Sequence, residues 1–352
     1  MKKILIYHLG GFNKTEGVGS VALSIAENLE GYKITLLSPK RMRKILFYSF
    51  LSPLWFAFKA FKEKPDLVFV HTLEASFDPI IAKKLFGFKY KVLTLAHGTT
   101  KGVLEAYLFE RKLNNTNMGF SFELNLRMSN FRAGFARFSD KVTCVSSYVQ
   151  KELSLYYGIN AEVIPNGINL LPKREKPKIQ GEVKTILFAG NLYWLKGLHY
   201  LIKANNLLSV PKKIIAVGIS PAQEEKLKQI VDCFNVDFLG MIKNEELLKL
   251  YPKVDLFAMP SMYESFGITY LEALSNKVPV IASCKTGAED IVKHKVNGYL
   301  VEKGNIESIK GALEYCEKNR ASFRISPSDF AKFSWTKIGR KYKEVISSIL
   351  EG

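Results

Sequence analysis

Short apolar runs alternate with amphipathic segments along the chain, and turn residues separate them. The apolar runs predict β-strands at 3–9, 33–37, 67–71, 90–96, 141–146, 184–190, 213–218, 236–240, 256–259 and 278–282. Segments with an apolar stripe at helical spacing predict α-helices at 20–29, 147–157, 198–208, 222–234, 244–251, 268–274 and 336–350. We therefore expect strands and helices in alternation, which is the order of an α/β fold.

The length and composition of the chain indicate a soluble protein of two domains. A chain of 352 residues is longer than one typical core supports. Hydrophobic residues make up 47% and charged residues 24%, as in soluble globular proteins, and no run of about 18 uncharged apolar residues predicts a transmembrane helix. The first strand begins directly after Met-Lys-Lys, and the four cysteines form no Cys-x-x-Cys pair. We therefore expect a cytoplasmic protein whose cysteines are buried thiols.

The net charge of +18 is concentrated in the first half of the chain. Residues 1–180 carry 27 basic against 14 acidic residues, a balance of +13, and residues 181–352 carry 24 against 19, a balance of +5. Such an excess fits an anionic substrate, an anionic membrane or nucleic acid. No nucleic-acid-binding motif accompanies the dispersed lysines, so we expect no nucleic-acid partner.

The segment from Lys40 to Lys64 combines basic and aromatic residues. Its leading basic residues are Lys40, Arg41, Arg43 and Lys44. Basic residues flanking aromatic ones are typical of an interfacial helix, so we predict contact with an anionic membrane surface through Lys40–Lys64. The alternative is two short core helices, interrupted at Pro53, whose lysines face water.

The loop after the first strand contains Gly17-Val-Gly19-Ser-Val-Ala22, which fits the G-x-G-x-x-A pattern. Such glycines allow close approach to a pyrophosphate, leave room for a substrate between domains, or close a tight strand-to-helix turn. An NAD enzyme would have an acidic residue at the end of the second strand, where this sequence continues into Ser38-Pro-Lys40. The absence of this acidic residue argues against an NAD-binding site.

Two histidines stand at the carboxyl ends of predicted strands. His71 ends the strand at 67–71, and His97 follows the strand at 90–96. Ligands of open α/β sheets bind at the carboxyl ends of strands, so both residues are candidates for a site. For each histidine alone, a structural role is the alternative.

The segment from 256 to 290 reads as strand, glycine turn, helix, loop and strand. Glu264 precedes the helix, Gly267 stands at its start, and Glu272 lies about two turns later on a neighbouring face. The N–H groups of Phe266, Gly267 and Ile268 are predicted to be free, and a helix N-terminus of this kind binds anions. Because carboxylates accept hydrogen bonds from hydroxyls, the combination favours a sugar nucleotide. The alternative is a helix with two surface glutamates.

This segment resembles a known family. Glu264-Ser-Phe-Gly-x-x-x-x-Glu272-Ala, followed by Pro279-Val-Ile-Ala-Ser283, is similar to the Glu-x7-Glu signature of the retaining glycosyltransferases of family 4, the group 1 enzymes. Further similar segments are Ile164-Pro-Asn-Gly-Ile-Asn169, Asn191 to Gly197, Gly287 to Val292, Asn297 to Val301 and Phe333-Ser-Trp335. The resemblance therefore extends over the whole chain and is strongest from Ile186 to Val301.

The resemblance implies the GT-B fold, in which two Rossmann-like α/β domains with parallel sheets face each other across a cleft. The implied acceptor domain is 1–169, the linker 170–183 and the nucleotide-sugar domain 184–332. The helix at 333–352 is expected to pack back toward the first domain.

The resemblance also implies roles for individual residues. Lys196 would face the donor diphosphate together with the N–H groups of the helix start, Glu264 would hold the donor sugar, and Glu272 would hold the ribose. His97 would lie near the reacting carbon. The remaining residues implied to bind the donor are Gly17, Gly19, Gly190, Asn191, Gly218, Ile242, Ser265, Phe266, Gly267 and Ile268. Asn191 stands where the family has an arginine, so one of two expected positive charges is missing.

The implied reaction moves a sugar from a nucleotide-diphosphate donor to a glycan or lipid-linked acceptor, with retention by front-face attack. It would serve the synthesis of cell-surface glycans or glycolipids, on the inner face of the membrane. No Asp-x-Asp occurs, so the sequence requires no metal, and no cofactor is expected. The alternatives are a sugar-nucleotide epimerase or phosphorylase of the same fold, an NAD enzyme using Gly17–Ala22, and a non-catalytic sugar-nucleotide-binding module.

Overall fold

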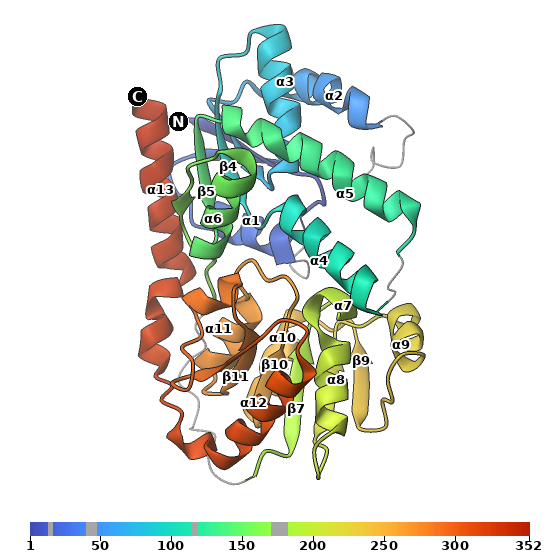
Figure 1. The fold of residues 1–352 in the computed structure, drawn as a ribbon. Helices are drawn as coiled ribbons and strands as arrows, with labels where there is room; N and C mark the ends of the chain where they lie inside the picture. Colours follow the sequence, from blue (N-terminus) through green and yellow to red (C-terminus); the bar gives the residue numbers. More distant parts are fainter. Residues whose placement is uncertain (13–16, 40–47, 115–117, 170–181) are drawn as a thin grey trace. The chain divides into compact units, whose positions relative to one another are not determined.

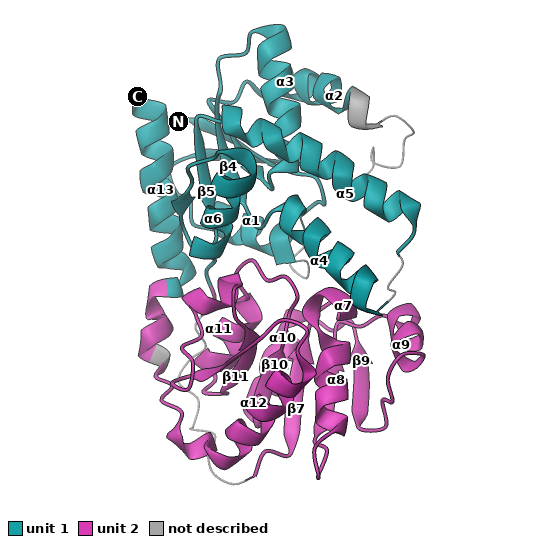
Figure 2. Ribbon diagram, viewed as in Figure 1, with its two compact units in different colours: residues 1–167, 333–352 teal, residues 168–332 magenta. Residues whose placement is uncertain are grey.

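A computed structural model describes residues 1–12, 17–39, 48–114, 118–169 and 182–352 (Figure 1). The chain forms two compact units (Figure 2). Unit 1 contains Met1–Gly167 together with Phe333–Gly352, and unit 2 contains Ile168–Lys332. Most of the expected linker, residues 170–181, and the basic residues 40–47 lie outside the described residues.

Unit 1 is built on a six-stranded parallel sheet of order β2-β1-β3-β4-β5-β6. Its strands are β1 Lys3–His8, β2 Lys33–Leu37, β3 Leu67–His71, β4 Lys91–Ala96, β5 Lys141–Cys144 and β6 Glu162–Val163. From β1 the chain passes to β2 on one side and then crosses to β3 on the other side. The direction of winding therefore changes between β1 and β3, the position at which open α/β sheets bind ligands.

Helices cover both faces of this sheet. The helices of unit 1 are α1 Gly17–Glu27, α2 Tyr48–Glu63, α3 Phe77–Phe86, α4 Thr100–Asn114, α5 Phe120–Ala133, α6 Ser147–Tyr157 and α13 Trp335–Glu351. Phe56 of α2 is buried in one cluster with Val68 and Val70 of β3. Phe69, which points to the opposite face, has its ring 5.4 Å from that of Tyr342 on α13. The carboxyl-terminal helix therefore completes the core of unit 1 and contacts β4 (Figure 1).

Unit 2 has a second six-stranded parallel sheet, of order β12-β11-β10-β7-β8-β9. Its strands are β7 Thr185–Ala189, β8 Lys213–Val217, β9 Val236–Gly240, β10 Leu256–Met259, β11 Val280–Ser283 and β12 Gly298–Val301. Its helices are α7 Tyr193–Lys196, α8 Leu198–Asn206, α9 Pro221–Lys228, α10 Asn244–Leu250, α11 Ile268–Ser275 and α12 Ile306–Lys318. Short 3₁₀ turns connect several elements: Glu74–Ser76, Gly134–Phe138, Tyr251–Lys253, Gly287–Asp290, Arg320–Ser322 and Pro327–Phe333.

Two parallel sheets with alternating helices confirm the α/β prediction. Within the described residues, none of the helices combines the length and the apolar character needed to cross a membrane. The four cysteines are free, Cys144 and Cys316 buried and the other two half-buried.

The largest differences from the expected helices lie in three segments. Pro53 lies inside α2 and does not divide the segment into two helices. The buried packing of Phe56, Ala57 and Ala60 against the sheet outweighs the hydrogen bond that the proline removes. The first helix starts at Gly17 and not at Ser20, so Gly17 and Gly19 form its first turn. The helix predicted at 222–234 ends already at Lys228, where its mostly exposed side chains offer little packing to extend it.

Candidate active site

The predicted site residues of unit 2 follow the carboxyl ends of four neighbouring strands. Gly190, Asn191 and Lys196 follow β7, Gly218 follows β8, Ile242 follows β9, and Glu264 to Gly267 follow β10. Strand β7 lies between β10 and β8, so the direction of winding changes between β7 and β10. The loops that carry Lys196 and Glu264 therefore leave the two strands that border this change of direction, where ligands of such sheets bind.

These two loops are in direct contact. The Lys196 ammonium donates to Glu264 Oε2 over 2.9 Å, and the Met262 N–H donates to the Leu195 carbonyl over 2.8 Å. Gly197 has a left-handed φ of 76°, and a Cβ there would lie 2.0 Å from the carbonyl oxygen of Pro260. A side chain at position 197 would separate the loops, so the glycine allows Lys196 to reach Glu264.

The Lys196–Glu264 ion pair is largely enclosed. The Glu264 side chain is 7% exposed and that of Lys196 is 21% exposed. Each charge offsets the cost of removing the other from water, and the pair holds both groups in a fixed place. The ammonium can bind an anion such as phosphate, and the second carboxylate oxygen of Glu264 can accept from a hydroxyl.

The start of α11 lies next to this pair. Gly267 adopts a left-handed φ of 92°, and a Cβ there would lie 2.2 Å from the Tyr270 ring. The Phe266 N–H, predicted to be free, instead points to Glu264 Oε1 at 3.4 Å. Gly267 and Ile268 still begin the helix, and N–H groups at a helix start have no partner within the helix. Of the three N–H groups that the sequence predicted to be free, that of Phe266 is thus directed to Glu264.

The loop after β11 contacts the backbone of Glu264 and Ser265. The Gly287 N–H donates to the Glu264 carbonyl over 2.8 Å. A Cβ at Gly287 would lie 1.9 Å from the Ser265 carbonyl oxygen, so only glycine allows the two backbones to approach this closely. Close packing of the two backbones therefore explains why a glycine stands at position 287, in a segment that resembles the family.

Glu272 lies on α11, and its carboxylate is held by a tyrosine. Tyr251, which is fully buried, donates to Glu272 Oε2 over 2.9 Å. Burial raises the pKa of Glu272 to about 7, while hydrogen bonds from Tyr251 and Asn244 act in the opposite direction. Burial and the neighbouring carboxylate also raise the pKa of Tyr251 well above its usual value, so its hydroxyl remains a donor. No local sequence pattern points to Tyr251, because it is 21 residues away from Glu272 along the chain.

The segments that follow β7 and β8 in unit 2 also approach each other closely. Gly218 has a φ of 91°, and a Cβ there would lie 2.7 Å from the Gly190 carbonyl oxygen. The exposed Asn191 accepts at its backbone carbonyl a hydrogen bond of 2.8 Å from Gln223, which sequence analysis did not single out. Ile242 is half-buried just beyond β9. The predicted residues of unit 2 thus gather at one edge of its sheet.

Unit 1 carries three histidines at the change of winding in its own sheet. His8 ends β1, His71 ends β3, and His97 follows β4. His8 Nδ1 lies 3.2 Å from the His71 carbonyl oxygen, and His71 Nδ1 lies 3.3 Å from His97 Nε2. Burial and the neighbouring His8 lower the pKa of His97 to about 3, and burial lowers that of His71 well below its usual value. His71 and His97 are therefore neutral near pH 7, and one ring donates to the other.

Two family models match the chain almost end to end. Residues 17–170 match the model described as Glycosyltransferase Family 4, and residues 172–332 match the model described as Glycosyl transferases group 1. The chain belongs to the group 1 glycosyltransferases of family 4. The boundary between the two matches falls close to the boundary between the two compact units.

This group 1 glycosyltransferase matches curated relatives over part of their length. An uncharacterized glycosyltransferase of Methanocaldococcus jannaschii is 30% identical over 60% of this chain and 61% of the relative. A GDP-mannose-dependent phosphatidylinositol monomannoside mannosyltransferase of Mycobacterium tuberculosis is 29% identical over 50% of this chain and 52% of the relative. The matched region thus spans about half to three fifths of these relatives.

Solved structures share the fold of this glycosyltransferase. The lipopolysaccharide outer core galactosyltransferase WaaB has a TM-score of 0.73 at 17% identity, with 99% of each chain covered. Anabaena Alr3699/HepE in complex with UDP-glucose has a TM-score of 0.73 at 20% identity, covering 99% of this chain and 100% of that one. These similarities confirm the GT-B architecture.

Proposed function

We propose that this chain transfers a sugar from a nucleotide-diphosphate donor to an acceptor hydroxyl, with retention at the anomeric carbon. The observation that carries the proposal is the meeting of Lys196, Glu264 and the start of α11 at the change of winding in unit 2. One site then offers positive charge to a diphosphate and a carboxylate to hydroxyl groups.

On the donor side, Lys196 and the N–H groups of Gly267 and Ile268 would offset the charge that grows on the leaving diphosphate. Asn191 is uncharged, so Lys196 is the single cation in the loop from Gly190 to Gly197. The Lys196 ammonium alone would thus stabilise the negative charge for which the family has two cations. Front-face attack by the acceptor would account for retention.

The two glutamates would hold the two ends of the donor. Glu264, paired with Lys196, would accept from hydroxyls of the transferred sugar. Glu272, oriented by Tyr251, would accept from the ribose hydroxyls. The other predicted donor contacts are Gly190, Gly218, Ile242, Ser265 and Phe266.

Unit 1 would supply the acceptor side. His97 would act as a neutral imidazole near the reacting carbon, since its pKa is about 3. Gly17 and Gly19 in the first turn of α1 would allow a substrate to come close to the backbone. A glycan or lipid-linked acceptor fits the basic first half of the chain, and the enzyme would act in cell-surface glycan or glycolipid synthesis on the cytoplasmic face of a membrane.

The test is a transfer assay with radiolabelled nucleotide sugars, GDP-mannose and UDP-glucose among them, and a membrane extract as acceptor source. Movement of label to lipid or glycan, with the anomeric configuration of the donor preserved by NMR, is the expected result. Conversion of the donor to its epimer without acceptor would identify an epimerase. Binding with no turnover of any donor would identify a non-catalytic module, and either outcome would contradict the proposal.

The raised pKa of Glu272 predicts a pH dependence. Above pH 7 the carboxyl is ionised and accepts from two hydroxyls, whereas below pH 7 it carries a proton and is the poorer acceptor. We expect kcat/KM for the donor to fall as the pH is lowered through about 7, because this parameter reports groups of the free enzyme. The measurement is kcat/KM for the donor between pH 5.5 and 8.5.

The control for this prediction is a pair of glutamine variants. Glu272→Gln keeps the shape and removes the titrating group, so its profile is expected to be flat near neutral pH. Glu225→Gln on the exposed surface of α9 should keep the wild-type profile. A decline of equal steepness in Glu272→Gln would show that another group titrates.

A further inference from the structure

Helix α2 exposes one apolar face while burying another. Phe56, Ala57 and Ala60 are buried against the sheet of unit 1. Leu51, Leu54, Phe58 and Phe61, spaced by three or four residues, are 52%, 50%, 66% and 69% exposed. A contiguous exposed apolar face of this kind is typical of a surface that binds a protein or a membrane.

The exposed apolar surface continues beyond α2. Leu85 and Phe86 at the end of α3, which packs beside α2, are 64% and 53% exposed. The Phe86 ring lies 6.1 Å from that of Phe88, and Phe88 lines the same pocket as Phe61. The end of α3 and the exposed face of α2 therefore meet at this pocket.

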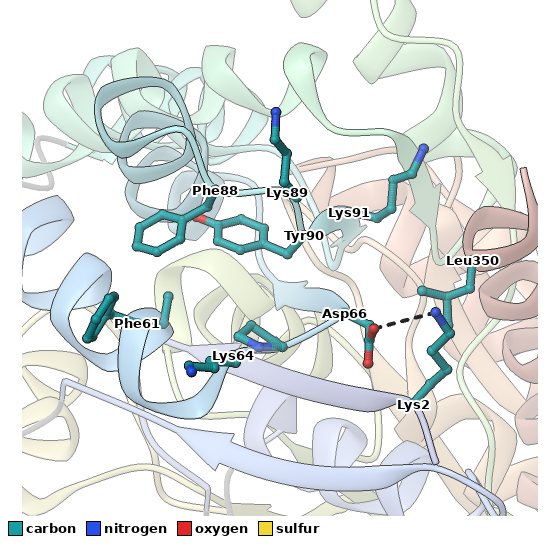
Figure 3. A pocket seen from close by; sticks show the side chains of 11 residues that line it. Lys2, Phe61, Lys64, Asp66, Phe88, Lys89, Tyr90, Lys91 and Leu350 are labelled. Atoms are coloured by element: carbon teal, nitrogen blue, oxygen red, sulfur yellow. Dashed lines mark hydrogen bonds and ion pairs between the residues drawn. The ribbon is translucent and has the colours of Figure 1, made fainter.

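The pocket has a volume of about 430 Å³ and lies at the amino ends of β1, β3 and β4 (Figure 3). Its four lysines are Lys2, Lys64, Lys89 and Lys91, and its one carboxylate is that of Asp66. In Figure 3 the rings of Phe88 and Tyr90 lie between Lys89 and Lys64. A concave site with aromatic walls and a basic rim suits a phosphate that is attached to an apolar group.

The charges of the pocket are only partly neutralised. Lys2 lies 3.5 Å from Asp66, and Lys91 lies 3.7 Å from Asp140. In the described part of the chain, no carboxylate comes within ion-pair distance of Lys64 or Lys89. Two ammonium groups at the end of the apolar face are therefore available to an external anion.

Lysine side chains also accompany the apolar face of α2. The Lys59 ammonium lies 5.9 Å from the centroids of both the Trp55 and Phe58 rings, and Lys62 is exposed next to Phe61. Lysines that extend along aromatic side chains keep their charge at an interface while their stems remain in apolar surroundings. This arrangement is that of a helix lying in the plane of a bilayer surface.

We propose that α2, the end of α3 and the lysine pocket form a docking surface for a bilayer of anionic phospholipids. Leu54, Phe58 and Phe61 would enter the acyl boundary, and a lipid phosphate would bind at the basic rim of the pocket, to which Lys64 and Lys89 belong. A second copy of the chain is a poorer occupant, because a self-complementary interface would bring two basic surfaces together. The surface lies at the strand ends opposite to His8, His71 and His97, so the inference does not depend on the proposed sugar transfer.

The test is co-sedimentation of the full chain with phosphatidylcholine vesicles that contain or lack phosphatidylglycerol. We expect binding to the anionic vesicles alone, weakened as salt is raised. Phe58→Ser with Phe61→Ser, and separately Lys64→Gly with Lys89→Gln, should each weaken binding by about tenfold or more. Glycine suits position 64 because Lys64 has a left-handed φ of 49°, so the second variant should fold normally.

Matched controls change similar side chains elsewhere. Phe234→Ser, at 62% exposure, and Lys213→Gln on β8, at 56% side-chain exposure, both in unit 2, should leave vesicle binding unchanged. Equal binding to both kinds of vesicle, or no effect of either double variant, would overturn the proposal. So would a dimer in light scattering that Phe58→Ser with Phe61→Ser dissociates, because the surface would then belong to a second copy.

Discussion

The Lys196→Ala variant is expected to lose about 100- to 1,000-fold in kcat for sugar transfer, the usual effect of removing one group that stabilises developing charge. The loss should be large because the loop after β7 brings no other cation to the site. It should also lower stability by roughly 3–5 kcal/mol, because Glu264 would be left buried without its counter-ion. The measurements are kcat with a saturating donor and the free energy of unfolding in urea.

A second variant separates the two effects. Lys196→Met combined with Glu264→Gln removes both charges, so we expect it to regain most of the stability and none of the transfer activity. Lys213→Ala, at the amino end of β8, should match the wild type in kcat. Recovery of transfer in the double variant would show that Lys196 acts only by neutralising Glu264.

Gly197→Ala is expected to destabilise unit 2 by about 2–4 kcal/mol, because alanine is strained at a positive φ and its methyl overpacks the contact. The added Cβ would lie 2.0 Å from the Pro260 carbonyl, so the loops after β7 and β10 must move apart. Transfer should fall as well, since the same movement draws Lys196 away from Glu264. Thermal unfolding, together with kcat under conditions where the variant remains folded, measures both effects.

The control for this substitution is another glycine of the same unit. Gly311 lies within α12, and a Cβ there would meet nothing within 4 Å. Gly311→Ala should stabilise the chain by roughly 0.5–1 kcal/mol, as expected for alanine in a helix interior. A Gly197→Ala variant as stable as Gly311→Ala would contradict the account of the loop contact.

The strands were predictable because each is a short apolar run that ends at a polar or glycine residue. Leu256–Met259, Gly267 and the helix from Ile268 are found as the sequence indicated. The alternative of two helices interrupted at Pro53 is wrong, because the effect of a proline is local, whereas the packing that keeps α2 continuous comes from residues distant in sequence. Local patterns thus predicted the elements better than their exact ends.

The positions of the candidate residues in the fold were predictable, but the contacts between them were not. The sequence placed Lys196 and Glu264 in loops after the correct strands, and Glu272 on the helix that follows. Strand order alone tells which loops lie at the carboxyl ends of the strands. The ion pair joins residues 68 apart, and Tyr251 and Glu272 are 21 apart, so neither contact has a local pattern. The inward turn of the Phe266 N–H toward Glu264 was missed because it depends on the loop conformation.

The most direct test of the central claim, that unit 2 holds a nucleotide diphosphate with Glu272 on its ribose, is calorimetric titration. Uridine, guanosine and adenosine diphosphates would first identify the base that binds. The wild type and Glu272→Ala would then be titrated with that diphosphate and with its 2′,3′-dideoxy form. The wild type should prefer the ribose form by about tenfold or more, as expected for hydrogen bonds to a charged group. In Glu272→Ala this preference should disappear, and an undiminished preference would contradict the assignment.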